Sequence, residues 1–149
     1  MEKTLTSDDQ RQCGRCSLCC KLPAIADFDK PYGVWCKNCK VGSGCGIYPD
    51  RPGTCRDFVC AWRRTPRMHD ELRPDKCGVV LAPRTHPHFG WLLVAMVEKA
   101  NWDRVRKPRM RQFLINVQSF GYKVFVIDGN DQKQMLRDGT LAPAPRFID

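Results

Sequence analysis

Residues 13–20 read Cys-Gly-Arg-Cys-Ser-Leu-Cys-Cys, and this stretch decides how the amino-terminal part of the chain folds. Two residues separate the first cysteine from the second, and two separate the second from the third. A tight turn across that spacing brings two sulfur atoms to the same side, where they can bind one metal ion. We therefore predict that bound metal orders this part of the chain.

Further cysteines follow the first run as far as residue 60. The pairs Cys13-x-x-Cys16 and Cys36-x-x-Cys39 match the two ligand pairs of a zinc ribbon, which gives one complete four-sulfur site. The other cysteines are numerous enough for a second site, and the adjacent Cys19 and Cys20 can serve two neighbouring centres. Nine of the ten cysteines are predicted metal ligands: Cys13, Cys16, Cys19, Cys20, Cys36, Cys39, Cys45, Cys55 and Cys60.

The spacing leaves the identity of the metal open between zinc and iron. Cys13, Cys16 and Cys19 are also spaced like three ligands of an iron–sulfur cubane. Ferredoxin-type runs, however, usually close with a cysteine followed by proline, whereas Lys21 follows Cys20 here. Closed sites of four thiolates suit either metal. We favour zinc and keep iron or a [4Fe-4S] cluster as the alternative cofactor.

A later segment makes the cysteine pattern more specific. Residues 44–52 read Gly-Cys-Gly-Ile-Tyr-Pro-Asp-Arg-Pro, and Cys55-Arg56-x-Phe58-x-Cys60 follows. Together with the first run and the distant pair, residues 11–64 resemble the bacterial CxxCxxCC family, whose members are described as zinc- or iron-chelating domains. The resemblance implies metal chelation by the matched cysteines and implies no particular reaction. It does not extend to residues 65–149.

Length and composition predict one domain. The chain has 149 residues, of which 42% are apolar, enough for one core but not for two cores and a linker. Within the single domain 1–149 we expect a cysteine-cluster lobe at 11–64 and a polar bridge at 65–75. A small α+β half at 76–131 and a tail at 132–149 should follow.

The second half carries ordinary secondary-structure patterns. β-branched runs at 78–82 and 90–98 predict neighbouring strands, with a hairpin loop at 83–89. A helix should begin near Pro108, since apolar residues at 110, 113, 114 and 117 follow helical spacing and Gly121 suits its end. A strand at 122–127 completes a β-β-α-β order. We expect a short helix around 132–137 and an extended tail at 142–145. The predicted fold is therefore α+β, with an irregular, metal-stapled, cysteine-rich amino-terminal lobe packed on a small β-β-α-β half.

The sequence also predicts the cellular compartment. Residues 1–12 are polar and charged and contain no apolar segment of a secretion signal. A membrane-spanning helix needs about 18 consecutive apolar residues, and no uninterrupted apolar run comes near that length. We therefore expect a cytoplasmic protein that makes no membrane contact. Thiols stay reduced in the cytoplasm, so dense cysteine favours metal ligation over disulfides.

The formal net charge of +9 raises the question of an anionic partner. Five cations fall in eight positions between Arg104 and Arg111, which fits a solvated helix face and also fits a phosphate backbone. No nucleic-acid recognition motif accompanies them, so a zinc-ribbon nucleic-acid binder is kept only as an alternative. No nucleotide-binding or hydrolytic motif is present either. Catalysis is therefore not predicted, although an iron–sulfur redox or radical enzyme component is the other alternative.

Several residues beside the cysteines have predicted supporting roles. Arg51 and Arg56 should neutralise the cluster or reach backbone carbonyls beside it. The amides of the glycines at 42, 44 and 46 are expected to donate to sulfur. Four aromatic residues should shield the cluster from water: Trp35, Tyr48, Phe58 and Trp62. Cys77 stands apart and is expected to be a buried free thiol.

Overall fold

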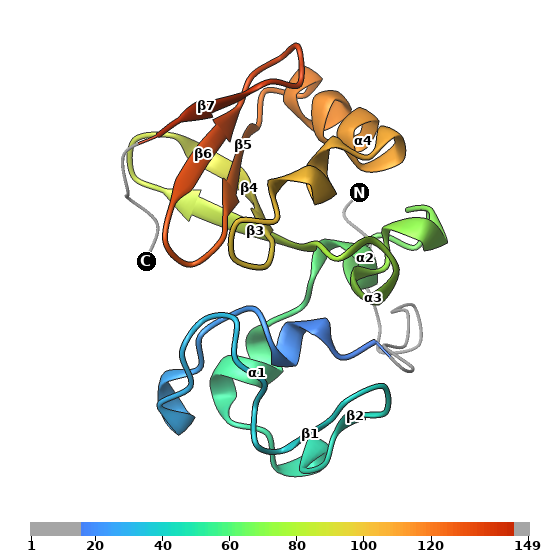
Figure 1. The fold of residues 1–149 in the computed structure, drawn as a ribbon, viewed down its shortest axis with the longest axis vertical. Helices are drawn as coiled ribbons and strands as arrows, with labels where there is room; N and C mark the ends of the chain where they lie inside the picture. The colour runs from blue at the N-terminus through green and yellow to red at the C-terminus, as the bar shows by residue number, and fades with distance from the viewer. Residues whose placement is uncertain (1–15, 145–149) are drawn as a thin grey trace, which may run out of the picture.

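A computed structural model describes residues 16–144 of the chain, so the predicted ligand Cys13 lies outside the described residues. The chain forms two packed parts (Figure 1). One is a five-stranded sheet with a helix against it, and the other is a lobe of short elements, here called the cysteine lobe, which comprises residues 16–64. The fold is a mixture of α and β structure, as predicted.

The sheet has the strand order β3-β4-β5-β6-β7. Strands β3 and β4 form an antiparallel hairpin, β4 and β5 are parallel, and β6 and β7 continue antiparallel from β5. The strands are β3 (Val80–His86), β4 (Gly90–Met96), β5 (Lys123–Ile127), β6 (Gln132–Met135) and β7 (Leu141–Pro143). The three predicted strands are thus confirmed, with two ends unchanged and the other four shifted by one to four residues.

The predicted loop at 83–89 is too long, because β3 continues through Pro83 as far as His86. Pro83 is paired with Leu93 in the hairpin register. Proline lacks an N–H and normally interrupts a sheet ladder, but β3 lies at the sheet edge, where that loss is tolerated. Only three residues then connect the two strands.

The helix predicted around 132–137 is wrong, since residues 132–135 form strand β6. Met135 lies opposite Val124 on β5 and is 1% exposed, so burial against the neighbouring strand determines the conformation. The tail from Leu141 to Pro143 then adds β7 beside β6. The extended conformation predicted for this tail is confirmed through residue 143, and the sheet gains two strands beyond the predicted β-β-α-β order.

Helix α4 (Pro108–Ser119) forms the crossover between the parallel strands β4 and β5. Pro108 occupies the first turn, and Met110 and Leu114 are buried, as the spacing predicts. Gly121 has a φ of +92°, the left-handed conformation that suits a residue just past a helix. A 3₁₀ turn over Trp102–Arg106 precedes the helix.

Every element of the cysteine lobe is short. The elements are 3₁₀ turns at Leu18–Cys20, Ala26–Phe28 and Tyr48–Asp50, strands β1 (Cys39–Lys40) and β2 (Gly44–Cys45), and helices α1 (Gly53–Asp57) and α2 (Ala61–Arg64). A 3₁₀ turn at Asp70–Leu72 and helix α3 (Pro74–Cys77) then lead to the sheet. Figure 1 shows α2, the last element of the lobe, and α3 at the junction with the sheet.

The two parts share one hydrophobic core. Leu22 and Trp62 of the lobe and Met68 and Leu72 of the bridge belong to the same buried cluster as the sheet residues. Leu22 is completely buried although it lies two residues after Cys20. The segment that follows the first cysteines is therefore fixed by apolar packing.

Tyr32 makes a second link between the lobe and the sheet. Its hydroxyl donates to the carbonyl oxygen of Val97 at 2.7 Å and lies 3.2 Å from that of Ile127. Its ring lies against Gly129, where an added Cβ would come within 2.5 Å of the ring. Gly129 also has a φ of +93° and is therefore required at this contact. Among residues 16–144, no helix combines the length and the apolar character needed to cross a membrane.

Candidate metal centre

A cavity of about 590 Å³ gathers most of the predicted metal ligands. Seven of the eight that fall within the described residues line it: Cys16, Cys19, Cys20, Cys36, Cys45, Cys55 and Cys60. They come from distant parts of the lobe sequence, from just before the first 3₁₀ turn to the start of α2. The fold therefore collects these cysteines around one space.

Backbone hydrogen bonds hold the first and second groups of cysteines together. The amide of Cys36 donates to the carbonyl oxygen of Cys20 at 2.9 Å, and the amide of Cys39 donates to that of Cys36 at 3.0 Å. Strand pairing then places Cys39 opposite Cys45. These contacts bring three separate stretches of the lobe side by side.

The thiols in this region interact directly. A hydrogen bond with Cys19, together with burial, raises the pKa of the Cys20 thiol. Burial and the proximity of Cys20 raise the pKa of Cys39 to about 12. Burial is also the main reason that the pKa of Cys55 is raised, with Cys20, Cys36 and Cys45 adding to it. Neutral thiols are therefore favoured here unless a cation stabilises the thiolates.

Lys30 is the one strongly buried cation near these thiols among the described residues, with an exposed fraction of 6%. Its ammonium group donates to three carbonyl oxygens: those of Lys21 at 2.7 Å, Pro23 at 2.7 Å and Pro31 at 3.0 Å. Burial lowers the pKa of Lys30, while the nearby cysteines, Cys36 first, act in the opposite direction. Sequence reasoning missed this residue, because no motif marks it and its role depends on how the loop closes.

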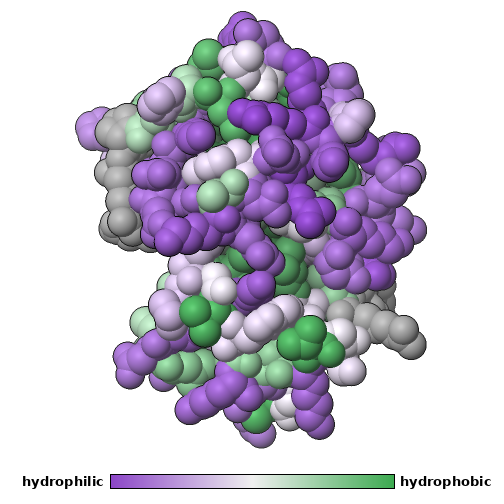
Figure 2. Space-filling model, in the orientation of Figure 1, coloured by the Kyte–Doolittle hydropathy of each residue, from purple (hydrophilic) through white to green (hydrophobic). Residues whose placement is uncertain are grey.

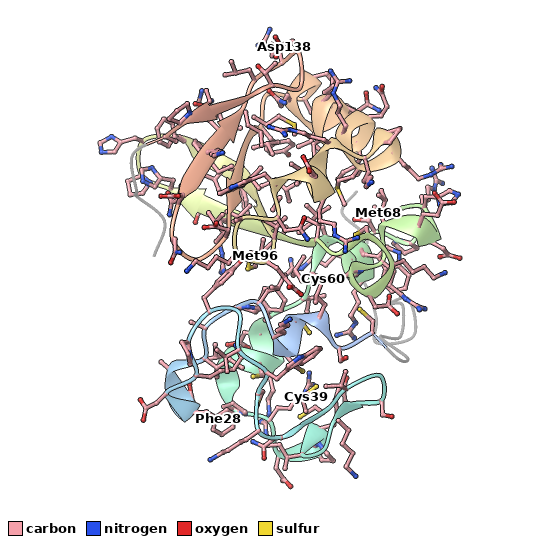
Figure 3. The ribbon with its side chains drawn as sticks, in the orientation of Figure 1. Phe28, Cys39, Cys60, Met68, Met96 and Asp138 are labelled. Atoms are coloured by element: carbon pink, nitrogen blue, oxygen red, sulfur yellow. The ribbon has the colours of Figure 1, made fainter. Side chains whose placement is uncertain are left out.

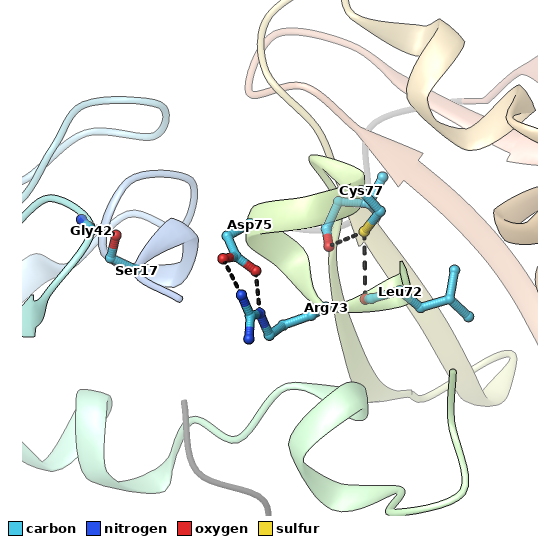
Figure 4. Close-up of polar contacts among 7 residues, drawn as sticks. Ser17, Gly42, Leu72, Arg73, Asp75 and Cys77 are labelled. Atoms are coloured by element: carbon cyan, nitrogen blue, oxygen red, sulfur yellow. Dashed lines mark hydrogen bonds and ion pairs between the residues drawn. The ribbon is translucent and has the colours of Figure 1, made fainter. Parts of the chain in front are cut away.

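Cys16 occupies a different environment at the edge of the lobe. It is buried and hydrogen-bonds to the carboxylate of Asp75, whose pKa is lowered mainly by its hydrogen bonds with Arg73. Arg73 and Asp75 form a two-point ion pair at the start of α3, which Figure 4 shows. Figure 3 shows Cys39 within the lobe and Cys60 at the junction with the sheet. The predicted ligands therefore spread from the lobe interior to this junction.

The donor chemistry fits zinc or iron, because thiolates are preferred ligands of both. All nine cysteines among residues 16–144 are free. Within the same residues, however, no three His, Cys, Asp or Glu side chains already stand as a group that could hold a metal ion.

The predicted supporting residues divide into two groups. Arg51 Nε donates to the carbonyl oxygen of Tyr48 at 3.0 Å, and Arg56 donates to that of Pro49 at 3.4 Å, which confirms the expected carbonyl contacts. The expected glycine–sulfur hydrogen bonds are wrong at two positions. The Gly42 amide donates to the Ser17 hydroxyl at 3.2 Å, with both residues drawn in Figure 4, and the Gly46 amide donates to a backbone carbonyl.

The aromatic residues also differ in their exposure. Trp62 is buried and lines the cavity together with Phe58. Tyr48 lines the cavity but is 47% exposed, and the Arg51 guanidinium stacks 3.8 Å from its ring centroid. Trp35 is 36% exposed and does not line the cavity. Shielding from water therefore falls mainly to Trp62 and Phe58.

Cys77 and the cations of the α4 region lie outside this cavity. The Cys77 thiol donates toward the carbonyl oxygen of Leu72 at 3.4 Å, as Figure 4 shows, and toward that of Val79 at 3.5 Å. Three of the five clustered cations already have partners. Arg106 pairs with Asp103, Arg109 pairs with Glu71, and Arg111 donates to the carbonyl oxygen of Asp138.

Comparison of the chain with protein families, with curated proteins and with solved structures found no match. The resemblance to the CxxCxxCC family therefore stays a prediction from the sequence motifs.

Proposed function

We propose that this protein binds zinc through the cysteines of its amino-terminal lobe, as a member of the CxxCxxCC type, with iron as the alternative metal. The observation that carries the proposal is the convergence of seven cysteines from separate stretches of the lobe on one cavity. All of them are free thiols. We place this chemistry in the cytoplasm, where thiols remain reduced.

The core of the proposed site is the set Cys20, Cys36, Cys45 and Cys55, which line the cavity, together with Cys39, which is paired with Cys45 beside it; these five are here called the inner thiols. A hydrogen bond with Cys19 and burial raise the pKa of Cys20, and burial, followed by the proximity of the neighbouring thiols, raises the pKa values of Cys39 and Cys55. Thiolates at this spacing would repel one another. A bound divalent cation would offset that repulsion, and a cluster of thiolates is favourable under this condition. Lys30 contributes one further positive charge beside them.

The proposed role of the metal is structural or in metal handling. The lobe has only two-residue strands and helices of four or five residues, so it gains little order from secondary structure. A saturated thiolate site also leaves no open coordination position for a substrate. Bound metal would therefore contribute mainly to the folding free energy of the lobe.

Metal analysis after anaerobic purification tests the proposal. Zinc, iron and acid-labile sulfide are measured on the intact protein, and stoichiometric zinc without sulfide is the expected result. Cys55→Ala should lower the metal content, whereas the matched variant Cys77→Ala should not, because Cys77 lies outside the cavity. A folded, metal-free protein with every thiol titratable would reject the proposal.

An iron–sulfur cluster is the second candidate, because Cys16 and Cys19, which are spaced like ligands of a cubane, both line the cavity. Stoichiometric sulfide and visible absorption after anaerobic reconstitution would select this candidate over zinc. Nucleic-acid binding gains no support of this kind, because Arg106, Arg109 and Arg111 already have protein partners.

A further inference from the structure

The cavity beside the cysteines has a second wall that metal binding does not use. Its lining includes apolar side chains from the lobe, among them Ile25, Phe28 and Phe58, and residues of the edge strand β3. Figure 2 shows hydrophobic residues at the waist between the lobe and the sheet. A volume of about 590 Å³ lies within the range of small-molecule sites, roughly 300–1,000 Å³.

Arginines outnumber carboxylates around this cavity. Four arginines line it, Arg51, Arg63, Arg64 and Arg84, against a single carboxylate, that of Asp57. The hydrogen bonds that Arg51 and Arg64 make through Nε go to backbone carbonyls, those of Tyr48 and Val59. Among the described residues, Arg51, Arg64 and Arg84 take part in no ion pair.

The position of two of these arginines suits the capture of an anion. Arg64 and Arg84 line the cavity and are also exposed to solvent. Arg64 ends α2, and Arg84 projects from β3, so the two approach the cavity from different elements. A guanidinium group binds a carboxylate through two parallel hydrogen bonds and cannot be deprotonated at neutral pH.

We propose that this cavity binds a small organic carboxylate with an apolar body. The apolar body lies against Ile25, Phe28 and Phe58, and the carboxylate is held by the two exposed arginines. The inference goes beyond the proposed function but rests on it in one respect, since bound metal orders the cysteine wall of the cavity. No covalent step is involved.

A rival explanation is that the arginines only balance the charge of metal-bound thiolates. The two explanations make different predictions. If the arginines serve only the thiolates, their removal lowers metal affinity and has no specific effect on a carboxylate. If they hold a carboxylate, their removal weakens carboxylate binding while the metal content stays unchanged.

Titration calorimetry on the metal-loaded protein, at fixed pH and ionic strength, tests the proposal with three probes. Octanoate supplies both the charge and the apolar body, octan-1-ol lacks the charge, and acetate lacks the body. Octanoate should bind at one site with an affinity about tenfold above that of octan-1-ol, as expected for a charge-assisted hydrogen bond. Acetate should show no saturable binding.

Variants complete the test. Arg64→Gln/Arg84→Gln should weaken octanoate binding by about tenfold or more and leave octan-1-ol binding unchanged. Arg137→Gln is the matched control, because Arg137 is exposed but lies outside this cavity. Absent octanoate binding, equal binding of octan-1-ol, or equal effects of the double variant and the control would each overturn the proposal. Metal content measured on the same samples separates these results from a failure of the metal site.

Discussion

Lys30 Nζ donates a hydrogen bond of 2.7 Å to the carbonyl oxygen of Lys21, the residue directly after the Cys19-Cys20 pair. The same ammonium group also reaches the carbonyl oxygens of Pro23 and Pro31. One buried cation thus closes the loop of residues 21–31 and holds the backbone that follows two predicted ligands. The fold of the loop and the charge beside the thiols depend on the same side chain.

Replacing Lys30 with methionine should lower the free energy of unfolding by about 3 kcal/mol, because three buried carbonyl oxygens lose a charged donor. Urea denaturation of the metal-loaded protein measures the change. Lys40→Met serves as the control, since Lys40 is exposed in the same lobe and should change stability by less than about 0.5 kcal/mol. Equal effects of the two variants would contradict the role assigned to Lys30.

Cys77 should remain protonated in the native protein at pH 8. Burial raises its pKa to about 11, and its thiol hydrogen-bonds to backbone carbonyls. Because only the thiolate is alkylated, iodoacetamide should modify Cys77 slowly until the protein is unfolded. Mass spectrometry of peptides after timed labelling measures the rate. Labelling in the native protein as fast as in urea would show that the thiol is not protected.

Asp128 should contribute stability that depends on pH. Burial alone would raise its pKa, but backbone amides of Asp131, Ala100 and Asn130 donate to the carboxylate and lower the pKa overall. Because the pKa of Asp128 is lower in the folded state, its contribution to the free energy of unfolding is fully present above its unfolded-state pKa of about 4. That contribution is lost as the pH falls through its folded-state pKa.

The variant Asp128→Asn tests this dependence. It should reduce the free energy of unfolding by about 2 kcal/mol at pH 7, and the difference from the unaltered protein should shrink below about pH 4. Denaturation curves at a series of pH values provide the measurement. A difference that stays constant from pH 7 to pH 3 would assign the effect to packing instead of charge.

Ala100 has a φ of +59°, a left-handed conformation that carries a steric cost for residues with a Cβ. Its amide donates to Asp128 at 2.8 Å, which holds it in that conformation. Ala100→Gly should therefore stabilise the protein by about 0.5–1 kcal/mol, measured by thermal or urea unfolding. Ala142→Gly, in strand β7, should have the opposite sign, and destabilisation by both variants would contradict the argument.

Local patterns made α4 and the first strands of the sheet predictable. Met110 and Leu114 recur at helical spacing and both face the core, so the information lies within a few turns of sequence. Strand β6 was not predictable in this way. Its conformation follows from pairing with β5, in which Met135 meets Val124 across the sheet, and no short window contains that contact.

The candidate site likewise combines features that local sequence predicts with features that depend on long-range contacts. Residue type and spacing identified the cysteines, because thiols two residues apart are recognisable without a fold. The position of Lys30 beside the thiols depends on how the loop after Lys21 folds, so the sequence alone does not reveal it. The hydrogen bond between Cys16 and Asp75 likewise joins residues that are far apart in the chain. Long-range contacts of this kind determine which thiols can share an ion, and the spacing of the cysteines does not predict them.

The hydroxyl of Tyr32 reaches the carbonyl groups of Val97 and Ile127, at the ends of two neighbouring strands. Heat that melts the lobe must break this contact and expose the apolar cluster that Leu22 and Trp62 share with the sheet. Both parts should therefore lose structure in one cooperative endotherm, in which the calorimetric and van't Hoff enthalpies agree. We therefore expect the cysteine lobe and the sheet to unfold together, as one cooperative unit.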